Sequence, residues 1–159
     1  MAVGVSERTV SRLLRRPRRP PSQTWHTFLT NHVATLASID FFTVPTFTGR
    51  VLFVLVVLMH HRRRIVHVDV TEHPTAIWTA QQMIEGFPDD PAPRWLLRDR
   101  DAIYGDAFRR RVAGIGIGEV ISSPSSPWQN PYAERLIGSI RRECLDHVIV
   151  LGEWHLRRT

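Results

Sequence analysis

Three carboxylates stand at positions where they could form a metal-binding site. Asp40 lies in the otherwise apolar, strand-like stretch TLASIDFFTVPT, where a buried charge is costly unless something pairs with it. Asp99 follows the apolar run WLLR, and Glu134 lies in the first turn of an expected carboxyl-terminal helix. Carboxylates that meet repel one another unless a cation holds them, and oxygen ligands alone favour Mg²⁺ or Mn²⁺ over zinc. A pair of such ions can stabilise both the attacking and the leaving oxygen of a phosphoryl displacement.

The elements that must position these residues alternate between strands and helices. Apolar or alternating stretches predict five strands, at residues 34–43, 51–59, 64–72, 95–99 and 119–123. Helical spacing and end signals predict three helices, at 73–87 with Pro74 in its first turn, at 105–116 and at 130–148. Short turns join the first three strands into an antiparallel meander, whereas the later strands need crossover connections. The pattern predicts an α/β fold with a mixed five-stranded sheet, three antiparallel strands followed by two parallel ones, and helices on both faces.

The last expected helix would carry Glu134 over the edge of the sheet. Asn130 is expected to cap this helix and Pro131 to fill its first position. At 3.6 residues per turn, Glu134 borders an apolar core stripe and Arg141 lies two turns below it. The stripe consists of Ala133, Leu136, Ile137, Ile140 and Cys144, and two arginines point toward solvent, Arg135 and Arg142. If the helix lies against the sheet, the three carboxylates can converge, although each of them could instead pair with an arginine.

The composition fits a globular domain with a basic balance. The chain has 159 residues with a formal net charge of +6, and all 21 of its basic residues are arginine. Arginine pairs well with phosphate, so nucleic acid is an expected partner, although a codon bias could also explain the missing lysines. The single cysteine excludes an internal disulfide, no cysteine–histidine cluster suits zinc, and the histidines show no metal-ligand spacing. The apolar run at 51–59 is too short to span a bilayer, so we expect a cytoplasmic protein without a membrane partner.

Two basic stretches have both a functional and a simpler interpretation. Residues 1–24 combine a short helix signal with the run RRPRRPP, which suggests the remnant of a DNA-binding helical module plus a linker, or else a solvated lead-in. The stretch HHRRR at residues 60–64 could contact a DNA backbone, but a solvated turn between two strands is favoured. Trp78 and Met83 are expected in the core.

Four segments together resemble a known family over residues 22–159. They read SIDFFTVPT, VTEHPTA, RDRDAIYGDAF and SPWQNPYAERLIGSIRRECLDHVIVLGEWHLR, and they are similar to the catalytic core of bacterial insertion-sequence transposases of the retroviral-integrase superfamily. The resemblance implies a ribonuclease-H-like fold with an Asp, Asp, Glu triad. Asp40 matches the first aspartate, Asp99 matches the second because it precedes Tyr104 by five positions, and Glu134 matches the glutamate, 35 positions after Asp99. Asp101 is then a neighbour, either solvated or paired with an adjacent arginine, Arg98 or Arg100.

The same resemblance implies DNA strand cleavage and strand transfer in recombination. Two Mg²⁺ or Mn²⁺ ions are implied, with Asp40 bridging both and Asp99 and Glu134 taking one each. The loop before the glutamate, Trp128, Gln129 and Asn130, is implied to lie close to DNA. Three helix arginines are candidates for phosphate contact, Arg135, Arg141 and Arg142, although they could be ordinary solvated charges, and Arg141 could pair with Glu134. DNA, as element ends and target, and further copies of the chain are the implied partners, in a bacterial, nucleoid-associated setting.

The sequence also departs from the family pattern. Position 131 is proline where relatives carry a small residue, which stiffens the loop next to the DNA. Most of the amino-terminal helical module is missing, and the chain stops soon after HLRR, so a truncated transposase is expected. A non-catalytic DNA-binding or inhibitory fragment is therefore the alternative function. A nuclease of the same fold acting on RNA–DNA hybrids is a weaker third interpretation.

Overall fold

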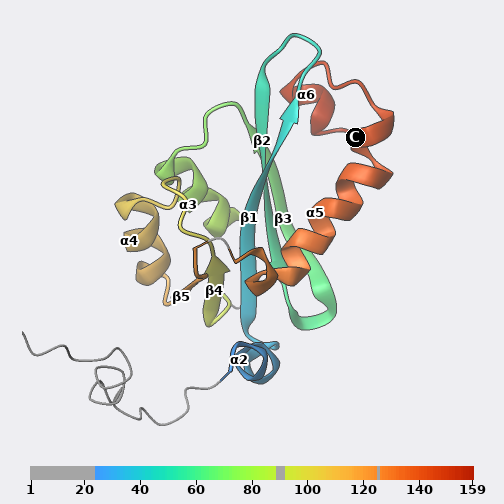
Figure 1. The fold of residues 1–159 in the computed structure, drawn as a ribbon. Helices are drawn as coiled ribbons and strands as arrows, with labels where there is room; N and C mark the ends of the chain where they lie inside the picture. Colours follow the sequence, from blue (N-terminus) through green and yellow to red (C-terminus); the bar gives the residue numbers. More distant parts are fainter. Residues whose placement is uncertain (1–23, 89–91, 125) are drawn as a thin grey trace, which may run out of the picture.

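A mixed sheet of five strands forms the centre of the molecule, in the order β3-β2-β1-β4-β5 (Figure 1). The structure is a computed structural model that describes residues 24–88, 92–124 and 126–159. The strands are β1 (Leu36–Pro45), β2 (Val51–Met59), β3 (Arg64–Thr71), β4 (Trp95–Arg98) and β5 (Gly118–Ile121). β1 and β3 each pair with β2 in antiparallel orientation, whereas β1 with β4 and β4 with β5 are parallel. The predicted sheet, three antiparallel strands followed by two parallel ones, is confirmed.

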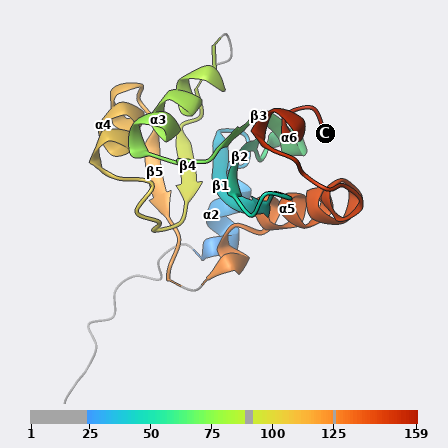
Figure 2. The same cartoon turned by 90° about the horizontal axis from the view of Figure 1, so that it is seen from above.

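Helices cover both faces of this sheet, as predicted. The α-helices are α2 (Trp25–His32), α3 (Ala76–Glu85), α4 (Asp106–Gly114), α5 (Pro131–Glu143) and α6 (Glu153–Leu156), and the single-turn helices are η1 (His61–Arg63), η2 (Pro127–Gln129) and η3 (Leu145–His147). Two views show α3 and α4 on one face and α5 and α6 on the other (Figures 1 and 2). No helix within the described ranges has the length and apolar content that a membrane crossing needs.

Each face of the sheet has its own apolar core, and β1 contributes to both. Ala37 and Ile39 belong to the core beneath α3 and α4, whereas Phe42 and Val44 belong to the core beneath α5. Because successive side chains of a strand point to opposite faces, Asp40 shares the face of Phe42. The strand therefore directs this carboxylate toward the side on which α5 packs.

The structure corrects several sequence expectations. α2 was not predicted, although Thr24 accepts a hydrogen bond from the Thr27 backbone and caps it. Pro74 lies outside α3, because the Thr75 hydroxyl caps that helix through the Trp78 backbone N–H. Cys144 is exposed rather than part of the core stripe of α5. Residues 1–23, which include nearly all of the predicted arm, lie outside the described residues.

Candidate active site

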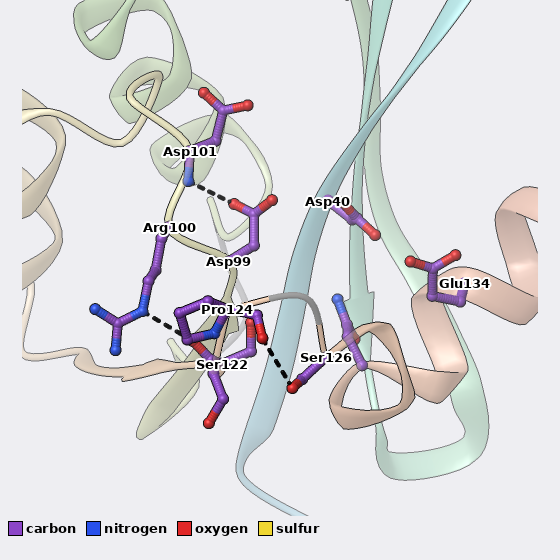
Figure 3. A pocket seen from close by; sticks show the side chains of 10 residues that line it. Asp40, Asp99, Arg100, Asp101, Ser122, Pro124, Ser126 and Glu134 are labelled. Atoms are coloured by element: carbon purple, nitrogen blue, oxygen red, sulfur yellow. Dashed lines mark hydrogen bonds between the residues drawn. The ribbon is translucent and has the colours of Figure 1, made fainter.

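A cavity of about 350 Å³ opens where β1, the end of β4 and the start of α5 meet. Its lining includes all three predicted carboxylates, Asp40, Asp99 and Glu134, together with Asp101 and Arg100. Figure 3 shows Asp40 with Asp99 on one side and Glu134 on the other. The structure therefore brings into one cavity three acidic residues that are up to 94 positions apart in the sequence.

Asp40 has the most strongly perturbed carboxyl group of the three. One of its oxygens accepts a 2.8 Å hydrogen bond from the Phe41 backbone N–H. Burial above all, with a smaller contribution from the carboxylates of Glu134 and Asp99, raises the pKa of Asp40 to about 7, although the Phe41 hydrogen bond acts in the opposite direction. Negative charge on Asp40 is therefore unfavourable near neutral pH unless a cation offsets it.

Asp99 begins the loop that follows β4, and this loop organises itself through its own carboxylates. Asp99 Oδ1 accepts from the Asp101 backbone N–H at 3.0 Å, and Asp101 Oδ1 accepts from the Ile103 backbone N–H at 3.0 Å. Asp101 is exposed, as the solvated alternative expected, and it joins no ion pair with Arg98 among the described residues.

A buried arginine beside Asp99 is a feature that sequence reasoning missed. Arg98 is 1 % exposed, and its Nε donates to Glu119 Oε2 at 2.5 Å. Its Nη1 donates to the Asp99 backbone carbonyl at 2.7 Å, and its guanidinium lies 5.2 Å from the centre of the buried Tyr104 ring. Burial raises the pKa of Tyr104, so this phenol stays neutral. The segment WLLR indicates only that an arginine stands at the end of a strand. It does not indicate the partner, because Glu119 is 21 positions away.

Glu134 lies on the exposed first turn of α5, where its backbone N–H donates to the Asn130 carbonyl at 3.1 Å. Pro131 fills the first helical position, as predicted. Asn130 occupies the cap position but makes no side-chain cap hydrogen bond, and its buried Oδ1 has no partner in the part of the chain described here. Arg141 does not pair with Glu134 within that part, because its guanidinium lies over the Phe42 ring, 5.6 Å from the centroid. The other two helix arginines, Arg135 and Arg142, are exposed as expected.

In the loop before Glu134, Trp128 is exposed and Gln129 is held by two hydrogen bonds. Trp128 is 67 % exposed. Gln129 Oε1 accepts from the Ser123 backbone N–H at 2.6 Å, and the Gln129 carbonyl accepts from the Trp25 indole N–H at 3.1 Å. The contact between Trp25 and this loop spans 104 positions, so no local pattern in the sequence could indicate it.

His60 does not belong to a solvated turn, which corrects one sequence expectation. It is 2 % exposed, and its Nε2 lies 2.5 Å from the Ser38 hydroxyl. Burial lowers the pKa of His60 to about 4, so the ring is neutral near pH 7. Its edge meets the ring of Tyr132 with centroids 4.9 Å apart, and the Arg63 guanidinium lies 5.0 Å from the same ring. Tyr132 precedes Glu134 by two residues, so these contacts hold the start of α5.

Comparisons with known proteins identify the fold. No protein-family model and no curated protein match the sequence. The solved structure of the Mos1 transposase catalytic domain with raltegravir and Mg matches with a TM-score of 0.68 and 13 % identity, over 84 % of this chain and 75 % of that one. The fold is that of a transposase or integrase catalytic core. A chain of the simian T-cell lymphotropic virus intasome, solved in complex with the PP2A regulatory subunit B56 gamma, matches with a TM-score of 0.66 and 12 % identity.

The second match covers 79 % of this chain but only 46 % of the intasome chain, so this chain spans less than half the length of that protein. The ribonuclease-H-like fold expected from the sequence is confirmed by both likenesses.

Within this transposase-like core, the donor set of the cavity suits a hard divalent cation. All three candidate ligands are carboxylates, and the one on β1 carries a raised pKa that a cation would reverse. The oxygens of these three carboxylates do not all lie within 4.8 Å of one another. Among the described residues, a separate group of three potential ligands does meet that distance. Joint coordination of one ion therefore needs a side-chain rotation, for which Asp99 and the exposed Glu134 have room.

Proposed function

We propose that this chain is the catalytic core of a bacterial insertion-sequence transposase, a polynucleotidyl transferase that cleaves DNA strands and transfers them to a target. The observation that carries the proposal is the meeting of Asp40, Asp99 and Glu134 in one cavity of a transposase-type fold. The perturbed pKa of Asp40 supports it, because strongly shifted groups in clefts concentrate at functional sites.

In this proposal the carboxylates of Asp40, Asp99 and Glu134 would together hold two Mg²⁺ or Mn²⁺ ions. When bound, such ions supply activation of a water or 3′-hydroxyl and stabilisation of the departing 3′-oxygen. The protein itself positions the residues that would hold these ions. The Phe41 backbone N–H fixes one oxygen of Asp40, and the Arg98 guanidinium fixes the backbone of Asp99.

DNA is the proposed partner of the surface around the cavity. The exposed Trp128 can stack against a base, and Arg135 and Arg142, which are exposed on α5, can approach phosphates. Arg141 is a weaker candidate, because its guanidinium packs on Phe42. Arg100 is an addition to the set, since it lines the cavity itself and donates to the Ser122 carbonyl at 3.2 Å. Assembly of further copies on the DNA belongs to the same proposal.

The test is a cleavage assay on labelled duplex DNA that carries the sequences flanking the gene for this chain. We expect strand cleavage at the element end in Mg²⁺ or Mn²⁺ and none in excess chelator. Binding of the same DNA is measured in parallel. Binding without any cleavage, in either metal, would favour the alternative of a non-catalytic DNA-binding or inhibitory fragment.

A further inference from the structure

A second group of potential metal ligands lies between β3 and α3, away from the carboxylate cavity. His67 and Asp69 are two residues apart on β3, so they point to the same face, and Glu85 lies on the last turn of α3. One ligand atom from each of the three lies within 4.8 Å of the others. The group is assembled from two separate elements, so the spacing of histidines along the sequence does not indicate it.

The group lies on the opposite face of the sheet from Asp40. Asp69 pairs across the sheet with Leu55, which belongs to the core beneath α3 and α4. Asp40 pairs with Val56, which belongs to the core beneath α5. Cross-strand partners share a face, so the two acidic groups are separated by the sheet and cannot share an ion.

Hydrogen bonds outside the group orient one oxygen of each carboxylate and leave the other facing inward. Asp69 Oδ1 accepts from the Val70 backbone N–H at 2.7 Å and from the Arg157 guanidinium. Glu85 Oε1 accepts from Gln81 Nε2 at 3.0 Å. Such outer hydrogen bonds are the usual support of metal ligands, because they fix the orientation of the oxygen that binds.

The amide of Gln82 enters the middle of the group. This side chain is 3 % exposed, and its end group lies 2.7 Å from His67 Nε2, 2.8 Å from Asp69 Oδ2 and 3.3 Å from Glu85 Oε2. With its oxygen inward and His67 Nε2 unprotonated, four atoms that carry lone pairs converge, and a cation among them would relieve their repulsion. With its nitrogen inward, the amide instead donates to these acceptors and holds the group together without an ion. The separations resemble the roughly 3 Å expected between neighbouring ligands of an ion with bonds of about 2.1 Å.

Two further features suit an ion at this position. A Cβ at Gly86 would lie 3.1 Å from the Cβ of His67, so glycine at position 86 gives the end of α3 room to approach the histidine. Glu85 is exposed, which leaves a path from solvent to the buried amide of Gln82. The group is therefore tightly assembled on one side and accessible on the other.

We propose that His67, Asp69, Gln82 and Glu85 bind a divalent transition-metal ion such as Zn²⁺, which joins the edge strand β3 to α3. One imidazole nitrogen with three oxygens suits zinc better than magnesium, which is bound by oxygens and water. The site is structural, and it is independent of the proposed cleavage chemistry. The bound ion connects β3 and α3, which otherwise make few contacts with each other.

Calorimetric titration with Zn²⁺ tests this proposal on the tag-free chain of 159 residues. The background carries Asp40→Asn and Glu134→Gln, so that the carboxylate cavity contributes no signal. We expect one zinc per chain, and at least a tenfold weaker affinity when Glu85→Gln or His67→Gln is added. Glu143→Gln, which neutralises an exposed glutamate on α5, is the matched control and should leave the affinity unchanged.

Thermal unfolding supplies a second measurement. Zn²⁺ should raise the unfolding temperature of the background protein and of the Glu143→Gln control, but not that of Glu85→Gln. Because Glu85 is exposed, its substitution should leave the fold intact, which circular dichroism checks. Absence of stoichiometric zinc binding, or equal affinity in Glu85→Gln, His67→Gln and the control, would overturn the proposal and leave the Gln82 amide as a hydrogen-bond donor to its neighbours.

Discussion

At Asp40, the negative charge that the proposed metal binding needs lowers the stability of the fold. Its position in a central strand forces partial burial, and two further carboxylates border the same cavity. The raised pKa expresses the free energy that ionisation costs in this environment. A protein selected for stability alone would favour an uncharged side chain here.

The first prediction concerns the stability that this conflict removes. The pKa of Asp40 is about 7 in the fold and near 3.8 when unfolded, so the stability that comes from its protonation is complete below about pH 4 and is lost as pH rises through 7. Asp40→Asn should therefore stabilise the metal-free protein at pH 8, by roughly 1–3 kcal/mol since water still reaches the cavity, and have little effect at pH 4. Urea unfolding in chelator at both pH values measures this. An equal change in the free energy of unfolding at the two pH values would contradict this prediction. Asp106→Asn, at an exposed position, is the control.

The second prediction concerns activity. Asp40→Asn, Asp99→Asn and Glu134→Gln should each abolish strand cleavage while circular dichroism shows an intact fold, because each removes a proposed metal ligand. Asp101→Asn should retain most activity, since Asp101 is exposed and its Oδ1 accepts only a local backbone hydrogen bond. The labelled-DNA assay measures all four variants. Wild-type cleavage by any of the first three would remove that residue from the site.

At the scale of elements, the start of α5 is fixed by aromatic contacts rather than by a side-chain cap. Asn130 leaves its oxygen unpaired within the described chain, whereas Tyr132 packs between the edge of His60 and the Arg63 guanidinium. η1 and the end of β2 therefore hold the turn that carries Glu134. Stability and the direction of the glutamate depend on the same small cluster.

The third prediction tests this cluster. Tyr132→Ala should lower the free energy of unfolding by about 1–2 kcal/mol, because a half-buried ring and its two partners lose contact. It should also reduce cleavage without weakening DNA binding to the same degree. Urea unfolding and the cleavage assay measure the two effects. The free energy of unfolding of Arg135→Ala, on an exposed position of the same helix, should stay within about 0.5 kcal/mol of wild type. An equal loss of unfolding free energy in both variants would argue against a stabilising role of the cluster.

The elements themselves were largely predictable, and their long-range partners were not. β2 was predicted at its observed bounds because its apolar run ends at clear turn signals, and β1 and β3 were displaced by only one or two residues. By contrast, the contact of α2 with the Gln129 loop, the buried state of His60 and the ion pair between Arg98 and Glu119 all depend on contacts between distant segments. Asp40 and Asp99 were singled out because acidic residues in or next to apolar strands stand out, and Glu134 because it lies in the first turn of the last helix. The ligand group at β3 was missed because its two halves lie on different elements.

At the scale of the whole molecule, positive charge is concentrated at one end of the sequence. Residues 1–23 contain six arginines and one glutamate, so five of the six net positive charges belong to that segment. Residues 24–159 contain 15 arginines and 14 acidic residues and are therefore close to neutral in comparison. Electrostatic attraction to DNA should therefore depend mainly on the amino-terminal segment.

The fourth prediction follows from this distribution. Removal of residues 1–23 should weaken binding to duplex DNA at low salt and reduce the dependence of log K on log salt concentration by up to about five, since each phosphate contact contributes about 0.9 to the slope. Fluorescence anisotropy between 50 and roughly 200 mM salt measures the slope. An unchanged slope would place the DNA contacts on the core instead.

One hydrogen bond joins α2 to the loop that precedes the proposed catalytic glutamate. The Trp25 indole, at the start of α2, holds the backbone of Gln129 only five positions before Glu134. A shift of α2 would therefore displace the loop that leads into α5, and with it the position of Glu134.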